Sequence, residues 1–143
     1  MSRISDLVAL IKRNIETVDN LVKSHGVDYV INDYVLLNAV LHMLQVSIQS
    51  LIDIGSIILS QSAYKVPSTY SEIPKLLVEI GALGNDDAEL FLRMISFRNI
   101  VVNQYSTVSL ELVRRMIKDS LHLDILRIAE GLYEFSLSKG IDY

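Results

Sequence analysis

Apolar residues recur every three or four positions through most of the chain, whereas the alternation typical of a strand is never sustained. This spacing gathers apolar side chains on one face of a helix. Glycine, proline and capping residues divide the pattern into five expected helices. These cover about residues 2–24, 32–62, 71–81 (or 71–84), 85–103 and 109–138. The sequence therefore predicts an all-α protein of one domain, residues 1–143, folded as an antiparallel helical bundle around its two long helices, the second and the fifth.

Several helix boundaries depend on single residues. Asn32 is a suitable N-cap for the second helix and Ser71 for the third, which places Pro74 in a first turn where no hydrogen bond is lost. The fifth helix is expected to be continuous, because one stripe of apolar residues follows it throughout. The stripe comprises Leu110, Val113, Ile117, Leu121, Ile125, Ile128, Leu132 and Phe135.

The second helix is unusual because it carries almost no charge. Between Asp33 and Lys65 the sequence has a single charged residue, Asp53. A helix that faces water normally carries several charges, so this one is expected to be covered nearly all round, with Gly55 allowing another backbone to come close. A polar line along it comprises Asn38, His42, Gln45, Gln49, Asp53, Ser56 and Ser60. We predict that part of this helix lies in a two-fold homodimer interface.

Composition narrows the classes of function. The chain has 143 residues, a formal net charge of −4 and no cysteine. The acidic balance excludes a protein that coats polyanions in general, so any contact with nucleic acid must be local. The lack of cysteine excludes disulfides, thiol nucleophiles and cysteine metal sites, and it favours a cytoplasmic protein. The uncharged stretch 34–52 has the length of a membrane span, but its polar side chains favour a buried helix of a soluble protein.

Arg98 is the most unusual residue of the fourth helix. At about 100° per residue, it falls in the middle of the apolar stripe, between Met94 and Val102. A guanidinium rarely enters a core unpaired. Two interpretations stay open. In the structural one, the arginine lies at the edge of the core or forms an ion pair with Asp53. In the functional one, it is held at an interface to bind an anion, and phosphate is the anion that suits its planar guanidinium. Tyr105 returns to the same face, where simple core packing is the alternative to a functional role.

A resemblance to HEPN-domain proteins, and most closely to the HepT group of toxins, is carried by residues 97–105, FRNIVVNQY. The signature of that group is arginine, usually a polar residue such as asparagine, three further residues, histidine, one residue and tyrosine. This chain matches it at Arg98, Asn99 and Tyr105 and departs from it at Asn103. The low-charge second helix, the short third helix and the acidic lead-in to the fourth extend the resemblance over nearly the whole chain.

The resemblance implies a metal-independent ribonuclease toxin, encoded beside a minimal nucleotidyltransferase that acts as its antitoxin. Two copies of the motif are expected to face one RNA-binding cleft between the protomers of a homodimer. Arg98 would hold the scissile phosphate and stabilise its charge, with Asn99 and Asp53 in support, while the motif histidine would act as general base or acid. The nucleotidyltransferase would attach AMP to Tyr105 and so block the cleft. No metal and no cofactor are implied.

Asn103 is the departure that matters for catalysis. A carboxamide does not titrate near neutral pH, so it cannot serve as a general acid or base. We therefore expect this copy to be catalytically impaired, with its fold and its RNA groove intact. The asparagine fits either an engineered inactivation, favoured by the intact remainder of the motif, or a natural variant that only binds.

The other candidates have simpler interpretations beside the functional ones. Arg114, Arg115 and Lys118 form the strongest basic cluster, which is either a solvated helix face or a guide for the RNA backbone. The three histidines, expected as a helix cap, a buried polar group and a surface residue, are His25, His42 and His122. Two rival functions stay open: a non-catalytic helical adaptor that binds a nucleotidyltransferase or a nucleotide, and a plain dimerisation module.

Overall fold

The computed structural model describes residues 3–62 and 64–141. Within these ranges the chain forms seven α-helices, two short 3-10 helices and no strand, which confirms the predicted all-α class. The elements are α1 (Arg3–His25), α2 (Val27–Asn32), α3 (Tyr34–Gln61), η1 (Tyr70–Glu72), α4 (Ile73–Glu79), α5 (Asn85–Asn103), η2 (Tyr105–Thr107), α6 (Leu110–Lys118) and α7 (Leu121–Ser138). The fourth expected helix coincides with α5, and the second coincides with α3 to within two residues at either end.

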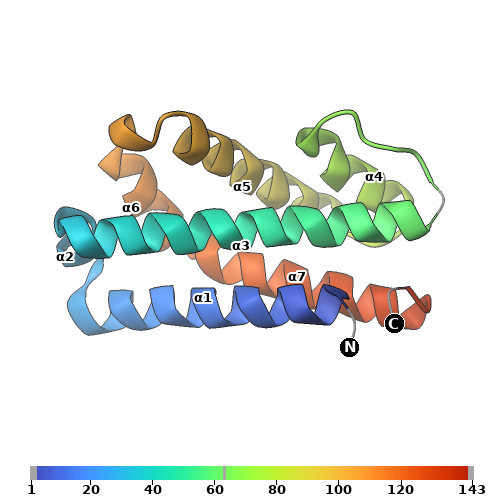
Figure 1. Ribbon diagram of the computed structural model, residues 1–143, viewed down its shortest axis with the longest axis horizontal. Coiled ribbons are helices and arrows are strands. Elements are labelled where there is room, and N and C mark those ends of the chain that lie inside the picture. Colours follow the sequence, from blue (N-terminus) through green and yellow to red (C-terminus); the bar gives the residue numbers. More distant parts are fainter. Residues whose placement is uncertain (1–2, 63, 142–143) are drawn as a thin grey trace.

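The helix α3 is the central element of the bundle (Figure 1). Both α1 and α5 run antiparallel to it, and α7 packs against α1 and α3. The short helix α4 covers the C-terminal half of α3, whereas α2 and α6 pack together near its N-terminal end. Side chains from these helices meet in one core, in which Leu44, Ile48, Leu51 and Phe91 are fully buried. Burial of this apolar surface is the main force that holds the helices together.

Two backbone turns separate the short helix α2 from its neighbours. Gly26 has a positive φ of 85°, a conformation that favours glycine. Asp33 is extended and caps α3, since its side chain accepts a hydrogen bond from the Leu36 backbone N–H at 2.9 Å. The sequence predicts Asn32 as this cap, but Asn32 instead ends α2 and donates its side-chain N–H to the Asp28 carbonyl at 2.8 Å.

The third helix also begins differently from the prediction. Thr69 and Glu72 form a capping box around η1, so Ser71 is not the cap. The helix α4 follows directly and carries Pro74 in its first turn, as predicted.

The prediction of a continuous fifth helix is wrong. A turn at Asp119 and Ser120 divides it into α6 and α7, and Ser120 adopts a left-handed φ of 57°. The helix α6 packs on α2, whereas α7 packs on α1 and α3, so the two follow different parts of the core. Ile117 and Leu121 are buried on either side of the turn. Because the apolar stripe continues across the break, hydrophobic spacing alone could not reveal it.

The same turn buries His122, which the sequence predicts at the surface. Its side chain is 3% exposed, and its Nε2 lies 3.2 Å from Asp19 Oδ1 of α1. Lys23 also binds Asp19, at 2.8 Å. Hydrogen bonds from Lys23 and His122 lower the pKa of the Asp19 carboxyl and outweigh the opposing effect of desolvation. This cluster ties the start of α7 to α1.

The helix α3 is long and apolar enough to cross a membrane, by length and composition alone. Core helices of soluble proteins pass the same test. In this bundle α1, α4, α5 and α7 all pack against α3, which is the position expected of a core helix.

Gly55 lets α4 pack tightly against α3. A Cβ atom at this position would lie 2.7 Å from Ile73 Cγ2 and 3.2 Å from Leu77 Cδ1. The close approach that the sequence predicts at Gly55 is therefore used within one chain, by side chains of α4.

Gly55→Ala is expected to destabilise the protein by about 1–3 kcal/mol, because an added methyl group overpacks this contact. Gly131→Ala is the matched control, since nothing lies within 4 Å of its Cβ position in α7. There the better helix propensity of alanine should stabilise by roughly 0.5–1 kcal/mol. Urea denaturation of both variants measures the two effects. Equal stabilisation by both would mean that Ile73 moves aside freely.

Candidate functional site

The motif residues lie at the end of α5, where the helix meets η2. Phe91, Met94 and Val101 point into the core and are fully buried, whereas Arg98 is half-buried. Val102, which the helical spacing places on the same stripe, is 42% exposed. Arg98 therefore lies at the margin of the apolar face and not in its middle.

The guanidinium of Arg98 has few partners within the chain. Its Nη1 donates to Asn99 Oδ1 at 2.9 Å, and its Cζ lies 5.3 Å from the centroid of the Tyr70 ring. The Nε atom is buried and has no hydrogen-bond partner among the described residues. Among the described residues, no carboxylate lies within ion-pair distance of Arg98. A half-buried cation without an anion is suited to bind one from outside.

Asp53 is not the partner of Arg98. Its Oδ1 accepts a hydrogen bond from Gln49 Nε2 at 3.0 Å, one turn earlier in α3. The internal ion pair that the sequence left open as an alternative is therefore not formed between these two residues. The sequence offers Asp53 only as one alternative partner of Arg98, because spacing along a single helix does not fix which faces of α3 and α5 meet.

Tyr70 is a member of the site that sequence reasoning missed. It comes from η1, and its ring provides a face on which the Arg98 guanidinium rests. Tyr70 is 43% exposed, so the residue also reaches the surface. The Thr69 to Glu72 spacing matches a capping box and signals the turn, but nothing in the sequence pairs this turn with the end of α5.

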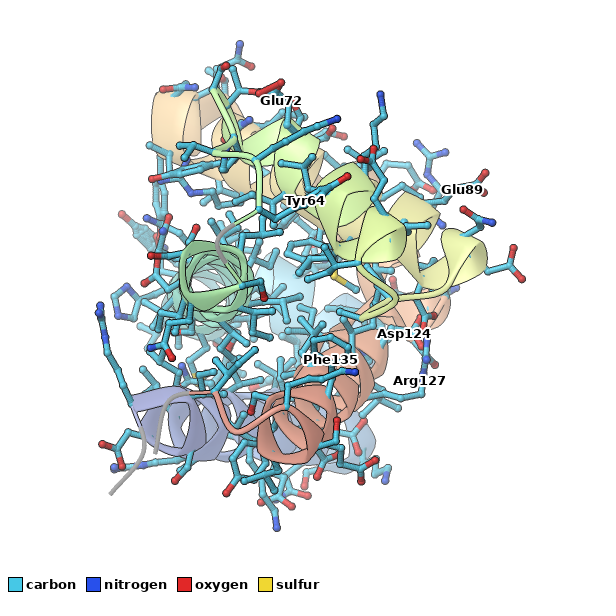
Figure 2. The ribbon with its side chains drawn as sticks, turned by 90° about the vertical axis from the view of Figure 1, so that its right-hand side faces the viewer. Tyr64, Glu72, Glu89, Asp124, Arg127 and Phe135 are labelled. Atoms are coloured by element: carbon cyan, nitrogen blue, oxygen red, sulfur yellow. The ribbon has the colours of Figure 1, made fainter. Side chains whose placement is uncertain are left out.

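Glu72 fixes the turn that carries Tyr70. Its carboxylate accepts hydrogen bonds from the backbone N–H groups of Ser68, at 2.5 Å, and Thr69, at 3.1 Å. These bonds, the one from Ser68 foremost, lower the pKa of the Glu72 carboxyl. In Figure 2 both Glu72 of η1 and Tyr64 lie above α3.

The amide proton resonances of Ser68 and Thr69 are expected to titrate together at acidic pH. Because Glu72 has a folded pKa below its ordinary value of 4.5, its carboxylate stabilises the turn fully above about pH 5 and loses this effect as the pH falls through the folded pKa. NMR titration measures the midpoint, which should lie below 4.5. The shifts should vanish in Glu72→Gln and persist in Glu79→Gln, the control. A midpoint at or above 4.5 would contradict the contact.

Asn103 is the last residue of α5 and is exposed. The helix includes both Arg98 and Asn103, and five residues at about 100° each place them roughly 140° apart around its axis. The two side chains therefore diverge within one chain. A site that uses both would need a second copy of the motif or a rearranged last turn.

Tyr105 lies in η2 and reaches back to α3. The residue is 41% exposed, and its hydroxyl donates a hydrogen bond to Asn38 Oδ1 at 2.7 Å. The residue is thus not a simple core-packing side chain.

The basic cluster on α6 is partly neutralised within the chain. Arg114 binds Asp28 of α2 at 2.9 Å and Glu111 at 2.7 Å. Arg115 and Lys118 are exposed. The described residues include no group of three or more histidine, aspartate or glutamate side chains that could hold a metal ion.

The model of the HepT-like family, described as ribonuclease HepT-like, matches residues 11–131. The fold is similar to that of the Shewanella oneidensis HEPN toxin in its tri-AMPylated form in complex with the MNT antitoxin, with a TM-score of 0.82 and 22% identity over 94% of this chain and 99% of that chain. A tyrosine-to-alanine mutant of the toxin–antitoxin MntA–HpeT has a TM-score of 0.80 and 21% identity, over 92% and 98% of the two chains. YutE from Bacillus subtilis, a cytosolic protein of unknown function, has a TM-score of 0.82 and 14% identity, over 97% and 95%. No curated protein matches the sequence.

Proposed function

Because the chain belongs to the HepT-like ribonuclease family, we propose that it is the toxin of a toxin–antitoxin pair and that its target is RNA. The observation that carries this proposal is that the Arg98 guanidinium lacks an anionic partner within the described residues. This guanidinium is half-buried and rests on Tyr70. A phosphodiester would supply the missing charge and accept the unused N–H groups.

The RNA-binding cleft of this proposal lies between two protomers. The polar line of α3 supports the arrangement, because His42 and Ser60 are exposed and Gln45 and Ser56 are half-buried in the single chain. This face carries only one charged residue, Asp53, which is unusual for a face that stays in water. A second copy would cover it and would bring a second Arg98 to the same cleft.

In solution the protein is expected to sediment as a dimer at micromolar concentration. His42→Glu should shift it toward monomer, because it places a charge on the face of α3 that the second copy would cover, and burial of an unpaired charge is costly. Ser138→Glu on α7 is the control and should leave the dimer intact. A wild-type chain that sediments as a monomer would remove the composite cleft from the proposal.

Within the cleft, Arg98 would hold the scissile phosphate and stabilise the charge that develops on it. Asn99 would orient the guanidinium through its hydrogen bond to Nη1. Asn103 stands where the family signature has histidine, so the general acid or base would be missing and cleavage impaired. Arg115 and Lys118 would attract the RNA backbone from α6. RNA cleavage by Asn103→His in the presence of chelator tests this assignment.

The partner of this proposal is a minimal nucleotidyltransferase that acts as antitoxin. Both the Shewanella oneidensis HEPN toxin and MntA–HpeT are described in such pairs. Tyr105 is an exposed residue, and its hydroxyl would be the group that receives AMP. The attached nucleotide would fill the cleft with bulk and negative charge. Like the protein from Bacillus subtilis described as cytosolic, this chain would act in the cytoplasm.

A second candidate is a non-catalytic adaptor that binds a nucleotidyltransferase or a nucleotide through the same cleft. Asn103 favours it, because the carboxamide keeps hydrogen bonding without proton transfer. A neighbouring gene with the Gly-Ser and Asp-x-Asp pattern of nucleotidyltransferases agrees with both candidates. Cleavage by Asn103→His distinguishes them.

A further inference from the structure

We propose that Asn38 is a positioning residue for the Tyr105 hydroxyl, and that AMP transfer to Tyr105 breaks the contact between them. The inference rests on the proposed function, because it takes Tyr105 as the AMP acceptor. Asn38 lies in the first turns of α3, whereas Tyr105 follows α5, so the contact joins two segments that are 67 residues apart.

The hydroxyl of Tyr105 is held at one defined place. It lies 2.7 Å from Asn38 Oδ1 and 3.5 Å from the backbone carbonyl oxygen of the same residue. Because 41% of the Tyr105 residue is exposed, packing alone leaves it considerable freedom. The hydrogen bond to Asn38 therefore has a large share in fixing where the phenolic oxygen lies.

The carboxamide of Asn38 is itself locked in one orientation. Its Nδ2 donates to the Tyr34 carbonyl oxygen at 2.7 Å. Rotation of the amide by 180° would set Oδ1 against that carbonyl, so that two acceptors would face each other. Oδ1 is therefore directed toward Tyr105, and the phenolic proton lies between the two oxygens.

This geometry prepares the hydroxyl for transfer. With its proton directed at Asn38, the phenolic oxygen keeps its lone pairs for attack on the α-phosphorus of ATP. The new bond joins that oxygen to phosphorus, the bond from phosphorus to the bridging oxygen of the β-phosphate breaks, and pyrophosphate leaves. The phenolic proton passes to a base of the nucleotidyltransferase or to water, since a neutral carboxamide does not take it up.

Transfer also removes the donor from the contact. The phenolic oxygen of AMP-tyrosine carries no hydrogen, so it and Asn38 Oδ1 are both acceptors and no longer attract each other. The side-chain hydrogen bond of Thr107 is local, to the Gln104 carbonyl at 3.3 Å, and does not reach α3. AMP attachment therefore releases η2 from α3, in addition to filling the cleft.

The experiment measures AMP transfer from ATP to this chain by a minimal nucleotidyltransferase, the class of partner that the proposed function names. Asn38→Ala is expected to lower kcat roughly fivefold, the effect of one hydrogen bond of ordinary net strength, with KM for the toxin unchanged. Asn32→Ala is the matched control. Asn32 makes the same local bond, from its side-chain N–H to the carbonyl four residues earlier, but lies in α2. It should leave both constants unchanged.

The outcomes separate this inference from the function on which it rests. Wild-type chain that takes up no AMP at Tyr105 overturns the proposed modification and the role of Asn38 together. Uptake at equal rates by wild type and Asn38→Ala overturns only the role of Asn38. Hydrogen exchange of residues 105–107 supplies a second measurement. Exchange should rise to the same level in Asn38→Ala, in Tyr105→Phe and in the AMP-modified protein, and unchanged exchange after modification would contradict the release of η2.

Discussion

Asn103→His is expected to give the chain an RNA-cleaving activity that persists in the presence of chelator. The substitution returns a titratable group to the exposed last residue of α5, where the family signature has histidine. An imidazole is half-protonated near pH 6.5, so it serves as base or acid at neutral pH, whereas the carboxamide does neither. General acid–base catalysis commonly contributes about 10²–10⁴-fold in rate, and the gain should fall in this range. Gel analysis of a labelled single-stranded RNA measures it.

Three comparisons make this experiment specific. Gln104→His adds an imidazole at the neighbouring exposed position and should not cleave RNA. An all-deoxy oligonucleotide should stay intact, because it lacks the 2′-hydroxyl on which the base acts. Equal cleavage by the wild-type chain and Asn103→His would refute the role of position 103. RNA binding without cleavage by Asn103→His would favour the adaptor.

Arg98→Ala is expected to weaken RNA binding by about 10- to 100-fold, because it removes a charge-assisted hydrogen bond to phosphate. Binding should also become less sensitive to salt, by about 0.7 in the logarithmic slope for each phosphate of a single strand that the protein no longer neutralises. The RNA affinity of Arg98→Lys should lie between those of the wild type and Arg98→Ala, since lysine keeps the charge but lacks the planar guanidinium that fits the Tyr70 ring. Fluorescence anisotropy with a labelled RNA over a salt series measures both effects.

The matched control for Arg98 is Arg93→Ala on the same helix. Arg93 is exposed and lies 3.6 Å from Asp119, so its removal should change RNA binding little. The stability of Arg98→Ala should stay close to that of the wild type, because the guanidinium has no internal carboxylate to leave unpaired. A large loss of stability with unchanged RNA binding would make Arg98 a structural residue and leave a dimerisation module as the remaining function.

Local patterns predicted much of the fold. Acidic residues at the start of α5 and its apolar spacing placed that helix at its observed bounds, and the uncharged run identified α3 as the core helix. These features depend on residues close together in sequence. The break at Ser120 escaped prediction because both sides of the turn bury apolar residues, and the burial of His122 followed from that missed turn.

For the site as well, some features followed from the sequence and others only from the tertiary structure. By itself, the sequence determined that an arginine, an asparagine in place of histidine and a tyrosine follow one another at the end of a helix, since spacing along one helix fixes these positions. Only the tertiary structure decided that the Arg98 guanidinium packs on the Tyr70 ring. It also decided that Asp53 accepts a hydrogen bond from Gln49 and not from Arg98, and that the Tyr105 hydroxyl donates to Asn38. Which residues of different helices come into contact depends on how the helices are rotated and packed against one another. That arrangement follows from the packing of the whole core, so no single segment of the sequence determines it.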